Sequence, residues 1–592
     1  MFPLLSFSSF QDPGQVIRRI SYLSILALVL LTVYFTSTSS PNISPALRWG
    51  PYVGESDRTK LANQSTVWFQ RAERVRNAYI HAYSNYRRYA FPHDEIMPLS
   101  KEWQDNFNGW GVSVFDSLDT MYLMRLDEEF SNALDLVERT TFSMEKNATL
   151  SVFETTIRYL GGLLSAYALS GNHLLLQKAD ELAEAMSPAF DTMSGLPWSS
   201  VNTVTGDVSG SYFGSLAEVA SCQLEYTYLA RETGKQEHYH KVDRIMKSLS
   251  ANIPSRASML PNHLSTINGL PTDVSYSAGG GADSGHEYLL KYYLLTSHQD
   301  PLSLDMYMRT TNEILTKLLY LSPKRSLLYV TDINQDGEAS HLFEHLSCFL
   351  PGLLALGVHS LPVSAFDNAT LLYTPYQEPF LSSFRLQEVH MWAAIGLGES
   401  CWLMYADQPT GLGPESVIMN PPPASRDHSR AFNISSGLWV EAIAKWNDGK
   451  REAEPPGTEE KSPESHFLSK DYLIYKAQYF LRPETIESMY YLWKVTGDER
   501  WRHRAWSIFE AIEQETKTEA GYASLLSVET SPAVQLDEMP SYFLAETLKY
   551  LYLFMDESDR VPLDMWVFNT EAHPLPIFTW TEAQKSAFNI TR

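Results

Sequence analysis

Apolar side chains recur at intervals of three and four residues along most of this 592-residue chain. Phe153, Ile157, Leu160, Leu164 and Tyr167 are one example, and this spacing places apolar side chains on a single face of an α-helix. Other segments repeat the pattern, and most of them begin near an acidic residue and end at a turn-forming sequence. The chain is therefore predicted to be all-α.

The polar residues at the predicted helix starts form a repeat. In chain order they are Asp116, Glu154, Glu218, Asp283, His345, Glu484 and Glu546. Most successive positions lie 62 to 65 residues apart. This spacing fits two helices with their connections, and it is longer than the repeat length of the common solenoid proteins. Seven helical hairpins that close in a ring would direct seven polar groups to one end of its axis.

One interval, from His345 to Glu484, is too long for a single hairpin. The excess lies in residues 420–470, which contain three consecutive prolines and the sequence GKREAEPPGTEEKSPES. Such a stretch cannot bury enough apolar surface to order itself, so we expect a surface insertion. No second domain is needed, and a single domain is predicted for residues 66–578.

The N-terminal segment is predicted to anchor the chain in a membrane. Two arginines at 18–19 precede an uncharged apolar run, residues 20–35, which the following threonines and serine can extend to 38. We expect a cytosolic tail (1–19), a signal-anchor span (20–38) and a lumenal Ser/Pro-rich stem (39–65), giving a single-pass type II protein. A cleaved signal peptide is the alternative. Asn-x-Ser/Thr sequons agree with a lumenal location, among them Asn63, Asn147, Asn368, Asn433 and Asn589.

Composition narrows the choice of partner. The formal net charge of −24 and the absence of a basic stripe argue against nucleic acid. Solubility alone explains such a charge. A more specific explanation is a cation site, or a neutral substrate on which carboxylates act as catalysts. Of the three cysteines, Cys222 lies within a helical pattern and is predicted to be a buried free thiol. Cys348 and Cys401 are the pair expected to form a disulfide in an oxidising lumen.

The acids at the helix starts have an ordinary structural explanation, because exposed amides and the helix dipole favour an acid in the first turn. Several acids gathered at one end of one barrel would nevertheless repel one another unless a cation or a substrate lies between them. Glycoside hydrolysis needs such a set, with a protonated acid at the leaving oxygen and a carboxylate that activates water. Aromatic residues near the same ends can stack on sugars or pack in the core: Trp110, Phe153, Tyr212, Phe213 and Tyr542.

The sequences around these residues resemble glycoside hydrolase family 47, the class I α-1,2-mannosidases, over about residues 66–578. The matching stretches are GWGVSVFDSLDT (109–120), FETTIRYLGGLLSAY (153–167), LAEVASCQLEY (216–226), ADSGHEYLLK (282–291), HLSCFLPG (345–352), LRPETIES (481–488) and VFNTEAHPLPI (567–577). The resemblance implies an (αα)7 barrel plugged by a C-terminal segment. It also implies inverting hydrolysis of terminal α-1,2-linked mannose from high-mannose N-glycans on glycoproteins, in the ER or Golgi, by an enzyme that we expect to be a monomer.

The resemblance further implies roles for individual residues. Glu154 is similar to the general acid, which acts through a water, and Asp283 and Glu484 are the carboxylates between which the base role has been assigned. Glu415 is also counted as catalytic in such enzymes. Substrate contacts are implied for Arg158, Glu218, His345, Arg482, Tyr542 and Glu546. Cys348 and Cys401 match the family's disulfide.

Calcium is the cofactor that the resemblance implies. Thr570 is similar to the residue that binds Ca²⁺ through its hydroxyl and its backbone carbonyl. Waters held by Glu484, Glu546 and Glu571, together with sugar hydroxyls, would complete the shell, which suits a hard cation with six to eight oxygen ligands.

Two departures from the family pattern bear on specificity. Typical members carry an arginine or a bulkier residue in place of Gly281, and aromatics in place of Gly285 and His286. Without a long side chain at 281, we expect broad trimming of several mannoses rather than the single-branch preference of the ER-type enzyme. Two alternatives are a quality-control member of the family that marks misfolded glycoproteins and a catalytically silent glycan-binding lectin. The sequence HLSCFLPG argues against the first alternative, and the intact acids argue against the second.

Overall fold

The computed structural model describes residues 55–253, 259–421 and 437–590. The chain divides into two compact units, Met1–Gln64 and Ser65–Arg592, and the second unit is described below. The predicted tail and membrane anchor lie outside the described residues. Within the described ranges, no single helix is long and apolar enough to cross a membrane, although one bent pair, Leu346–Ser360 with Val363–Leu372, meets both criteria together.

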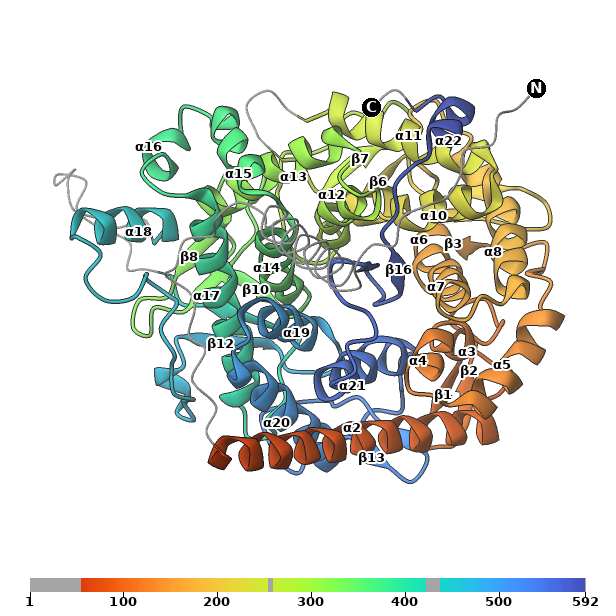
Figure 1. Ribbon diagram of the computed structural model, residues 1–592, viewed down its shortest axis with the longest axis horizontal. Helices are drawn as coiled ribbons and strands as arrows, with labels where there is room; N and C mark the ends of the chain where they lie inside the picture. Colours follow the sequence, from red (N-terminus) through yellow and green to blue (C-terminus); the bar gives the residue numbers. More distant parts are fainter. Residues whose placement is uncertain (1–54, 254–258, 422–436, 591–592) are drawn as a thin grey trace, which may run out of the picture. The chain divides into compact units, whose positions relative to one another are not determined.

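Within the described part of the chain, seven helices form a closed inner ring in which each packs against the next (Figure 1). They are α4 (Leu118–Leu123), α7 (Gly161–Ser170), α10 (Gln223–Thr233), α12 (Asp283–Leu295), α14 (Leu350–Ser360), α19 (Glu484–Thr496) and α21 (Leu548–Met555). The π-helical segment η8 (Phe543–Thr547) precedes α21 and contacts α4, which closes the ring. Residues 284–295 of α12 are all buried, as expected for a helix covered on every side.

A second layer of helices covers the ring. α5 (Asp127–Arg139), α8 (His173–Ala185), α11 (Gln236–Ala251), α13 (Pro301–Glu313), α17 (Leu386–Ala406) and α20 (Glu499–Glu515) each pack on the inner helix that precedes them. α2 (Glu55–Tyr89) adds a further outer helix, because its Trp68 ring lies 3.8 Å from the guanidinium of Arg502 on α20. The two layers confirm the predicted barrel of helical hairpins.

The C-terminal part of the chain plugs the ring. Strands β15 (Trp566–Phe568) and β16 (Pro574–Pro576) pair antiparallel, and they contact α12 and α7, respectively. Figure 1 shows β16 among the inner helices. The hairpin turn carries residues 569–573 into the ring, as the predicted plug requires.

Short elements join the helices. The strands are β1 (Glu95–Met97), β2 (Glu102–Gln104), β3 (Leu150–Ser151), β4 (Ser200–Val201), β5 (Val208–Ser209), β6 (Phe213–Ser215), β7 (His263–Ser265), β8 (Leu319–Leu321), β9 (Leu328–Val330), β10 (Leu342–Glu344), β11 (Ser416–Met419), β12 (Tyr472–Lys476), β13 (Lys517–Thr518) and β14 (Gly521–Tyr522). The remaining helices are α3 (Val112–Phe115), α6 (Val152–Glu154), α9 (Leu216–Val219), α15 (Val363–Ala369), α16 (Glu378–Leu381), α18 (Trp439–Asp448) and α22 (Glu582–Phe588). All paired strands are antiparallel, and such short pairs are set by tertiary contacts rather than by a periodic pattern.

The predicted insertion at 420–470 differs from our expectation over its second half. Trp439, Val440 and Ile443 of α18 are buried, and the Trp439 indole donates to the carbonyl of Pro456 at 2.8 Å. The amide of Lys461 donates to Glu399 on α17 at 3.0 Å. Residues 437–470 are therefore ordered against the barrel, because α18 presents an amphipathic face that the polar composition of the stretch conceals.

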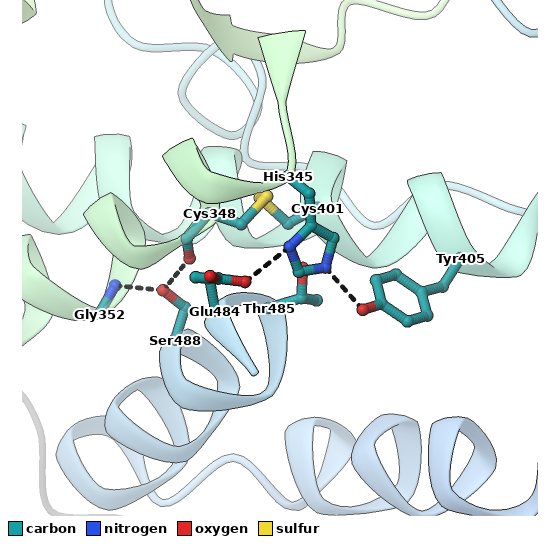
Figure 2. The surroundings of a disulfide bond; sticks show 8 residues. All are labelled: His345, Cys348, Gly352, Cys401, Tyr405, Glu484, Thr485 and Ser488. Atoms are coloured by element: carbon teal, nitrogen blue, oxygen red, sulfur yellow. Dashed lines mark hydrogen bonds and ion pairs between the residues drawn. A yellow bond between two sulfur atoms is a disulfide. The ribbon is translucent and has the colours of Figure 1, made fainter. Parts of the chain in front are cut away.

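The cysteine predictions are confirmed. Cys348, in the 3-10 turn η5 (Leu346–Phe349) before α14, forms a disulfide with Cys401 of α17, and Cys222 is free and buried. Ser488 of α19 donates to the carbonyl of Cys348 and accepts from the amide of Gly352 at 2.8 Å (Figure 2). These bonds hold α19 and α14 together close to the disulfide.

Candidate active site

A cavity of about 360 Å³ lies where several predicted helix starts converge. Of the predicted residues, its lining includes Glu154, Arg158, Glu218, Asp283, Arg482, Glu484, Tyr542, Glu546, Thr570 and Glu571. Asp116, His345 and Glu415 are not part of the lining. Phe153 and Tyr542 are the predicted aromatics that reach the cavity, whereas Tyr212 and Phe213 are exposed.

Local backbone structure sets how these acids enter the cavity. Glu154 ends α6 and is followed by the π-helical segment η2 (Thr155–Leu160), and Glu546 lies within the π-helical η8. π-Helical turns are rare and concentrate at functional sites. Glu218 belongs to a capping box with Ser215, whereas Asp283 begins α12. The ordinary capping role therefore accounts for Glu218 better than for the other acids.

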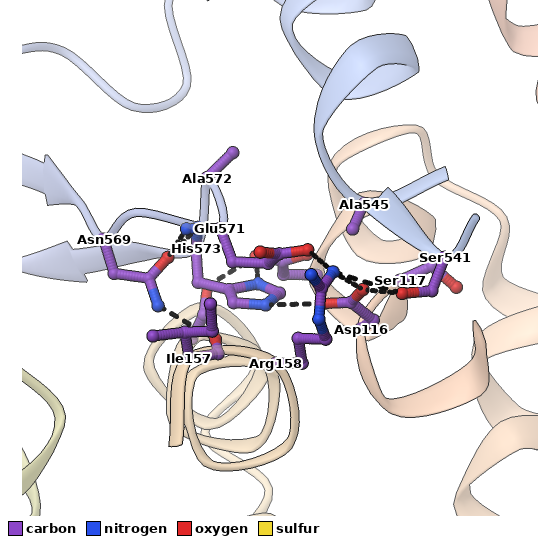
Figure 3. A network of polar contacts seen from close by, with 12 residues as sticks. Asp116, Ser117, Ile157, Arg158, Ser541, Ala545, Asn569, Glu571, Ala572 and His573 are labelled. Atoms are coloured by element: carbon purple, nitrogen blue, oxygen red, sulfur yellow. Dashed lines mark hydrogen bonds and ion pairs between the residues drawn. The ribbon is translucent and has the colours of Figure 1, made fainter. Parts of the chain in front are cut away.

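Arg158 joins the carboxylates on one side of the cavity. Its Nε donates to Glu154 Oε2 at 2.9 Å. Its Nη1 pairs with Glu571 and lies 3.5 Å from Asp116 Oδ2 (Figure 3). Burial lowers the pKa of Arg158, but the three carboxylates outweigh it and raise that pKa. Arg158 is therefore a permanent cation that fixes the position of Glu154.

His345 contacts Glu484 from behind the cavity. His345 Nδ1 lies 2.8 Å from Glu484 Oε2, and its Nε2 lies 2.6 Å from the hydroxyl of Tyr405 (Figure 2). Burial raises the pKa of Glu484, but His345 and Arg482 outweigh it, so the pKa is lowered. His345 thus orients the carboxylate and favours its ionised form, and it does so without facing the cavity.

Glu415 acts in a similar way through Arg482. Both oxygens of Glu415 accept from Arg482 Nε, at 2.8 and 3.0 Å. Arg482 lines the cavity, and its Nη1 lies 3.9 Å from Glu484 Oε1. Glu415 therefore positions an arginine of the cavity from outside it.

Sequence reasoning missed two acids of the lining, Glu287 and Glu487. They lie four residues after Asp283 and three after Glu484, which is the spacing of one helix face, so the sequence did contain the signal. Both contact Lys291, Glu487 at 3.6 Å. Burial raises the pKa of Glu487 to about 8, because the opposing charge of Lys291 does not outweigh burial and the neighbouring carboxylate of Glu287.

The electrostatics of the cavity favour a bound cation. Its acids are Glu154, Glu218, Asp283, Glu287, Glu484, Glu487, Glu546 and Glu571, against the two arginines Arg158 and Arg482. Burial, together with the neighbouring carboxylates Glu287 and Glu484, raises the pKa of Asp283 to about 7. Burial and neighbouring carboxylates likewise raise the pKa of Glu546 and Glu571 well above the ordinary range. A cation would relieve this repulsion.

The donor set fits a hard cation held mainly through water. In the described part of the chain, no three His, Cys, Asp or Glu side chains could hold a metal ion between them. Thr570 lines the cavity beside Glu546 and Glu571 and offers a hydroxyl as well as its carbonyl. Such oxygen ligands, with waters between the carboxylates and the ion, suit calcium better than zinc.

A buried network positions Thr570. The amide of Thr570 donates to the Tyr288 hydroxyl at 3.3 Å, and that hydroxyl donates to Glu225 at 2.7 Å. The side chain of Asn569 donates to Glu225 at 2.8 Å and accepts from the amides of Glu571 and His573 (Figure 3). The turn of the plug is thus fixed on both sides of Thr570.

The sequence profile of glycosyl hydrolase family 47 matches residues 78–577. The chain belongs to this family. It is a glycosidase, and the residues described above form the candidate active site of a family 47 enzyme.

Two relatives and one solved structure cover most of this family 47 chain. It is 33% identical over 535 residues to mannosyl-oligosaccharide 1,2-alpha-mannosidase of Arabidopsis thaliana, with 89% of the chain and 82% of that protein covered. It is 35% identical over 519 residues to the human endoplasmic reticulum mannosyl-oligosaccharide 1,2-alpha-mannosidase, covering 86% of the chain and 64% of the human protein. The alpha-1,2-mannosidase of Trichoderma reesei superposes with a TM-score of 0.72 at 29% identity, over 86% of the chain and 99% of that structure.

Gly281, Gly285 and His286 were the positions expected to depart from the family pattern, and one of them lines the cavity. Gly281 lines the cavity with φ +84°, and a Cβ there would meet only the Ser215 Cβ, at 3.7 Å. At Gly285 a Cβ would lie 2.7 Å from Leu216 Cγ, so α12 approaches α9 too closely for a side chain. His286 is buried, with Nε2 3.0 Å from the Ser277 carbonyl. Of these three residues, Gly281 alone lines the cavity.

Proposed function

We propose that this family 47 enzyme removes terminal α-1,2-linked mannose from high-mannose N-glycans by inverting hydrolysis. The observation that carries the proposal is the cavity, in which Glu154, Asp283, Glu484 and Thr570 meet. The names of the relatives, which are 1,2-alpha-mannosidases, support the proposal that the cleaved bond is α-1,2-linked.

The reaction needs one proton donated and one accepted. Glu154, through a water, supplies a proton to the oxygen between the terminal mannose and the next sugar as the anomeric C–O bond breaks. A second water attacks the anomeric carbon from the opposite face and loses its proton to a carboxylate, which yields β-mannose and the shortened glycan. We assign this base to Glu484, because His345 and Arg482 favour its ionised form.

Calcium is the cofactor that we propose for this cavity. Thr570 would bind it directly, and Glu484, Glu546 and Glu571 would hold its waters. A bound calcium ion supplies positive charge and coordination positions for sugar hydroxyls. The remaining substrate contacts fall to Arg158, Glu218, Arg482 and Tyr542.

The cellular setting follows from the same proposal. We propose that the enzyme is a monomeric, single-pass type II protein with its catalytic domain in the lumen of the ER or Golgi. The substrates would be glycoproteins that carry high-mannose glycans. The name of the human relative, an endoplasmic reticulum enzyme, supports this compartment.

Digestion of a nine-mannose glycan tests the function and its breadth. We expect the wild-type enzyme to release several α-1,2-linked mannoses, with β-mannose as the first product by NMR. Gly281→Arg should narrow the products towards one isomer, because a guanidinium that adds two charge-assisted hydrogen bonds at about 1.5–3 kcal/mol each would select one branch.

The matched control is Gly281→Asn. Position 281 has φ +84°, which asparagine tolerates better than most residues, and its short side chain cannot reach the distant sugars. Gly281→Asn should therefore keep the wild-type product range. If wild-type enzyme stops after a single mannose even at long times, the proposed breadth is wrong, and if it releases none, the activity itself is wrong.

The dependence of kcat/KM on pH tests the assignment of the base. The pKa of Glu484 is lowered and that of Asp283 is raised to about 7. A base must be ionised, so with Glu484 in this role kcat/KM for the nine-mannose glycan should hold as the pH falls from 7 to about 5. A decline in kcat/KM over this range would assign the base to Asp283 instead, because its pKa is the raised one. Calcium must saturate the enzyme at every pH.

A further inference from the structure

The histidine that stands behind Glu484 is itself contacted by a tyrosine of the outer helix layer. The hydroxyl of Tyr405, on α17, lies 2.6 Å from His345 Nε2, whereas His345 Nδ1 is the atom that faces Glu484 (Figure 2). The hydroxyl of Thr485 lies farther from the same Nε2 atom, at 3.3 Å. Tyr405 does not line the cavity, and no step of the proposed reaction uses it.

The hydroxyl of Tyr405 can fix which ring nitrogen of His345 carries the hydrogen. Burial raises the pKa of Tyr405 well above its ordinary range, so the hydroxyl keeps its hydrogen and can donate it to Nε2. When one nitrogen of a neutral imidazole accepts a hydrogen bond, the ring's own hydrogen is on the other nitrogen. That other nitrogen is Nδ1, which lies 2.8 Å from Glu484 Oε2. Tyr405 thus directs the hydrogen of His345 to the carboxylate.

The disulfide joins the two segments that carry this hydrogen bond. Cys348 follows His345 by three residues, and Cys401 precedes Tyr405 by four residues. Each cysteine therefore lies about one helical turn from one member of the pair. The covalent link between η5 and α17 keeps the histidine and the tyrosine within reach of each other.

The ordered part of the insertion holds α17 on both sides of Tyr405. Glu399, six residues before Tyr405, accepts from the amide of Lys461 at 3.0 Å. Asp407, two residues after Tyr405, accepts from the amide of Glu464 at 2.7 Å. Both carboxylates are buried. A residue that orients a functional group must itself be fixed by packing and hydrogen bonds, and Tyr405 meets this requirement.

We propose that Tyr405 is a positioning residue for the base: it orients His345, and His345 in turn holds the Glu484 carboxylate towards the attacking water. The inference rests on the proposed function, which assigns the base to Glu484. A carboxylate that is free to rotate would be aligned with the water in fewer of the enzyme molecules. The loss of alignment would lower kcat and leave the binding of the glycan unchanged, because Tyr405 lies outside the cavity lining.

Replacing Tyr405 by phenylalanine tests the inference, because the change removes the hydroxyl and keeps the ring. At saturating calcium we expect kcat on the nine-mannose glycan to fall about three- to tenfold, the equivalent of one hydrogen bond, and KM to change less than twofold. Tyr307→Phe is the matched control. Tyr307 is a buried tyrosine of α13 outside the cavity lining, and its hydroxyl has no hydrogen-bond partner in the described part of the chain. This control should keep wild-type kcat.

A second background separates positioning from a general effect on the fold. The variant His345→Gln already lacks the imidazole, so adding Tyr405→Phe to it should lower kcat no further. A further loss of the same size in that background would show that Tyr405 does not act through His345. If circular dichroism shows that Tyr405→Phe loses the wild-type fold while Tyr307→Phe keeps it, Tyr405 is a structural residue and the inference is wrong.

Two kinetic results would also overturn the inference. Wild-type kcat in Tyr405→Phe would show that the hydroxyl does not assist the base. A rise in KM that accounts for the whole loss of kcat/KM would show that the hydroxyl shapes the binding of the glycan instead. Failure of the wild-type enzyme to cleave the glycan would refute the proposed function.

Discussion

Replacing Glu154 by glutamine is expected to lower kcat on the nine-mannose glycan by about 10²–10⁴-fold, the usual contribution of a general acid. Glutamine keeps the size of the side chain and an oxygen that can accept from Arg158 Nε, which lies 2.9 Å from Glu154 Oε2 in the wild type. What it removes is the capacity to relay a proton to the leaving oxygen. Glycan affinity, measured by calorimetry, should therefore change little.

The control for this substitution is Glu338→Gln, an exposed position outside the lining of the cavity. It should retain wild-type turnover and affinity. Turnover close to wild type in Glu154→Gln would remove Glu154 from the acid role. A parallel loss of affinity would show that the Glu154–Arg158 pair binds the substrate rather than reacts with it.

Removing calcium is expected to abolish turnover, and adding it back to restore turnover. Calcium should also raise the Tm of the metal-free protein, because a ligand at 100 times its Kd stabilises the folded state by about 2.7 kcal/mol. Thr570→Ala should weaken calcium binding by roughly ten- to a hundredfold. This is the loss of affinity that follows when residues around a metal's ligands are replaced. Thr570→Ser keeps the hydroxyl and should bind nearly as well as the wild type.

The thermal shift separates two explanations of any lost activity. If Thr570→Ala loses turnover but keeps the calcium-dependent rise in Tm, Thr570 contacts substrate rather than metal. Full turnover in excess chelator, with no calcium left in the protein by metal analysis, would exclude calcium as the cofactor.

Much of the fold could be predicted because it repeats. The near-constant spacing of polar helix starts anticipated the ring, and Asp283 and Glu484 begin α12 and α19 as expected. The order of segment 437–470 could not be predicted from composition, because a few buried side chains such as Trp439 outweigh a largely polar sequence. The average composition of the segment does not reveal the stabilisation that these few buried side chains provide.

The candidate site was predicted less completely than the fold. A one-dimensional pattern placed His345 with the other polar starts, but only three-dimensional packing shows that it stands behind Glu484. Glu415, which was expected to be catalytic, accepts a hydrogen bond from Arg482 from outside the cavity lining, a relation between residues 67 apart. The role of Gly285 depends on a contact with Leu216, which no sequence period encodes.

The plug has a consequence for how the enzyme matures during synthesis. Ribosomes make the helices from α3 to α21 before the hairpin of β15 and β16, and domains tend to fold from the N-terminus as they emerge. Thr570 and Glu571 are therefore supplied only after the surrounding ring has been translated. A nascent chain that ends before residue 566 lacks the turn that brings Thr570 and Glu571 to the cavity. The cavity described above is therefore complete only after the plug hairpin has been made and has entered the ring.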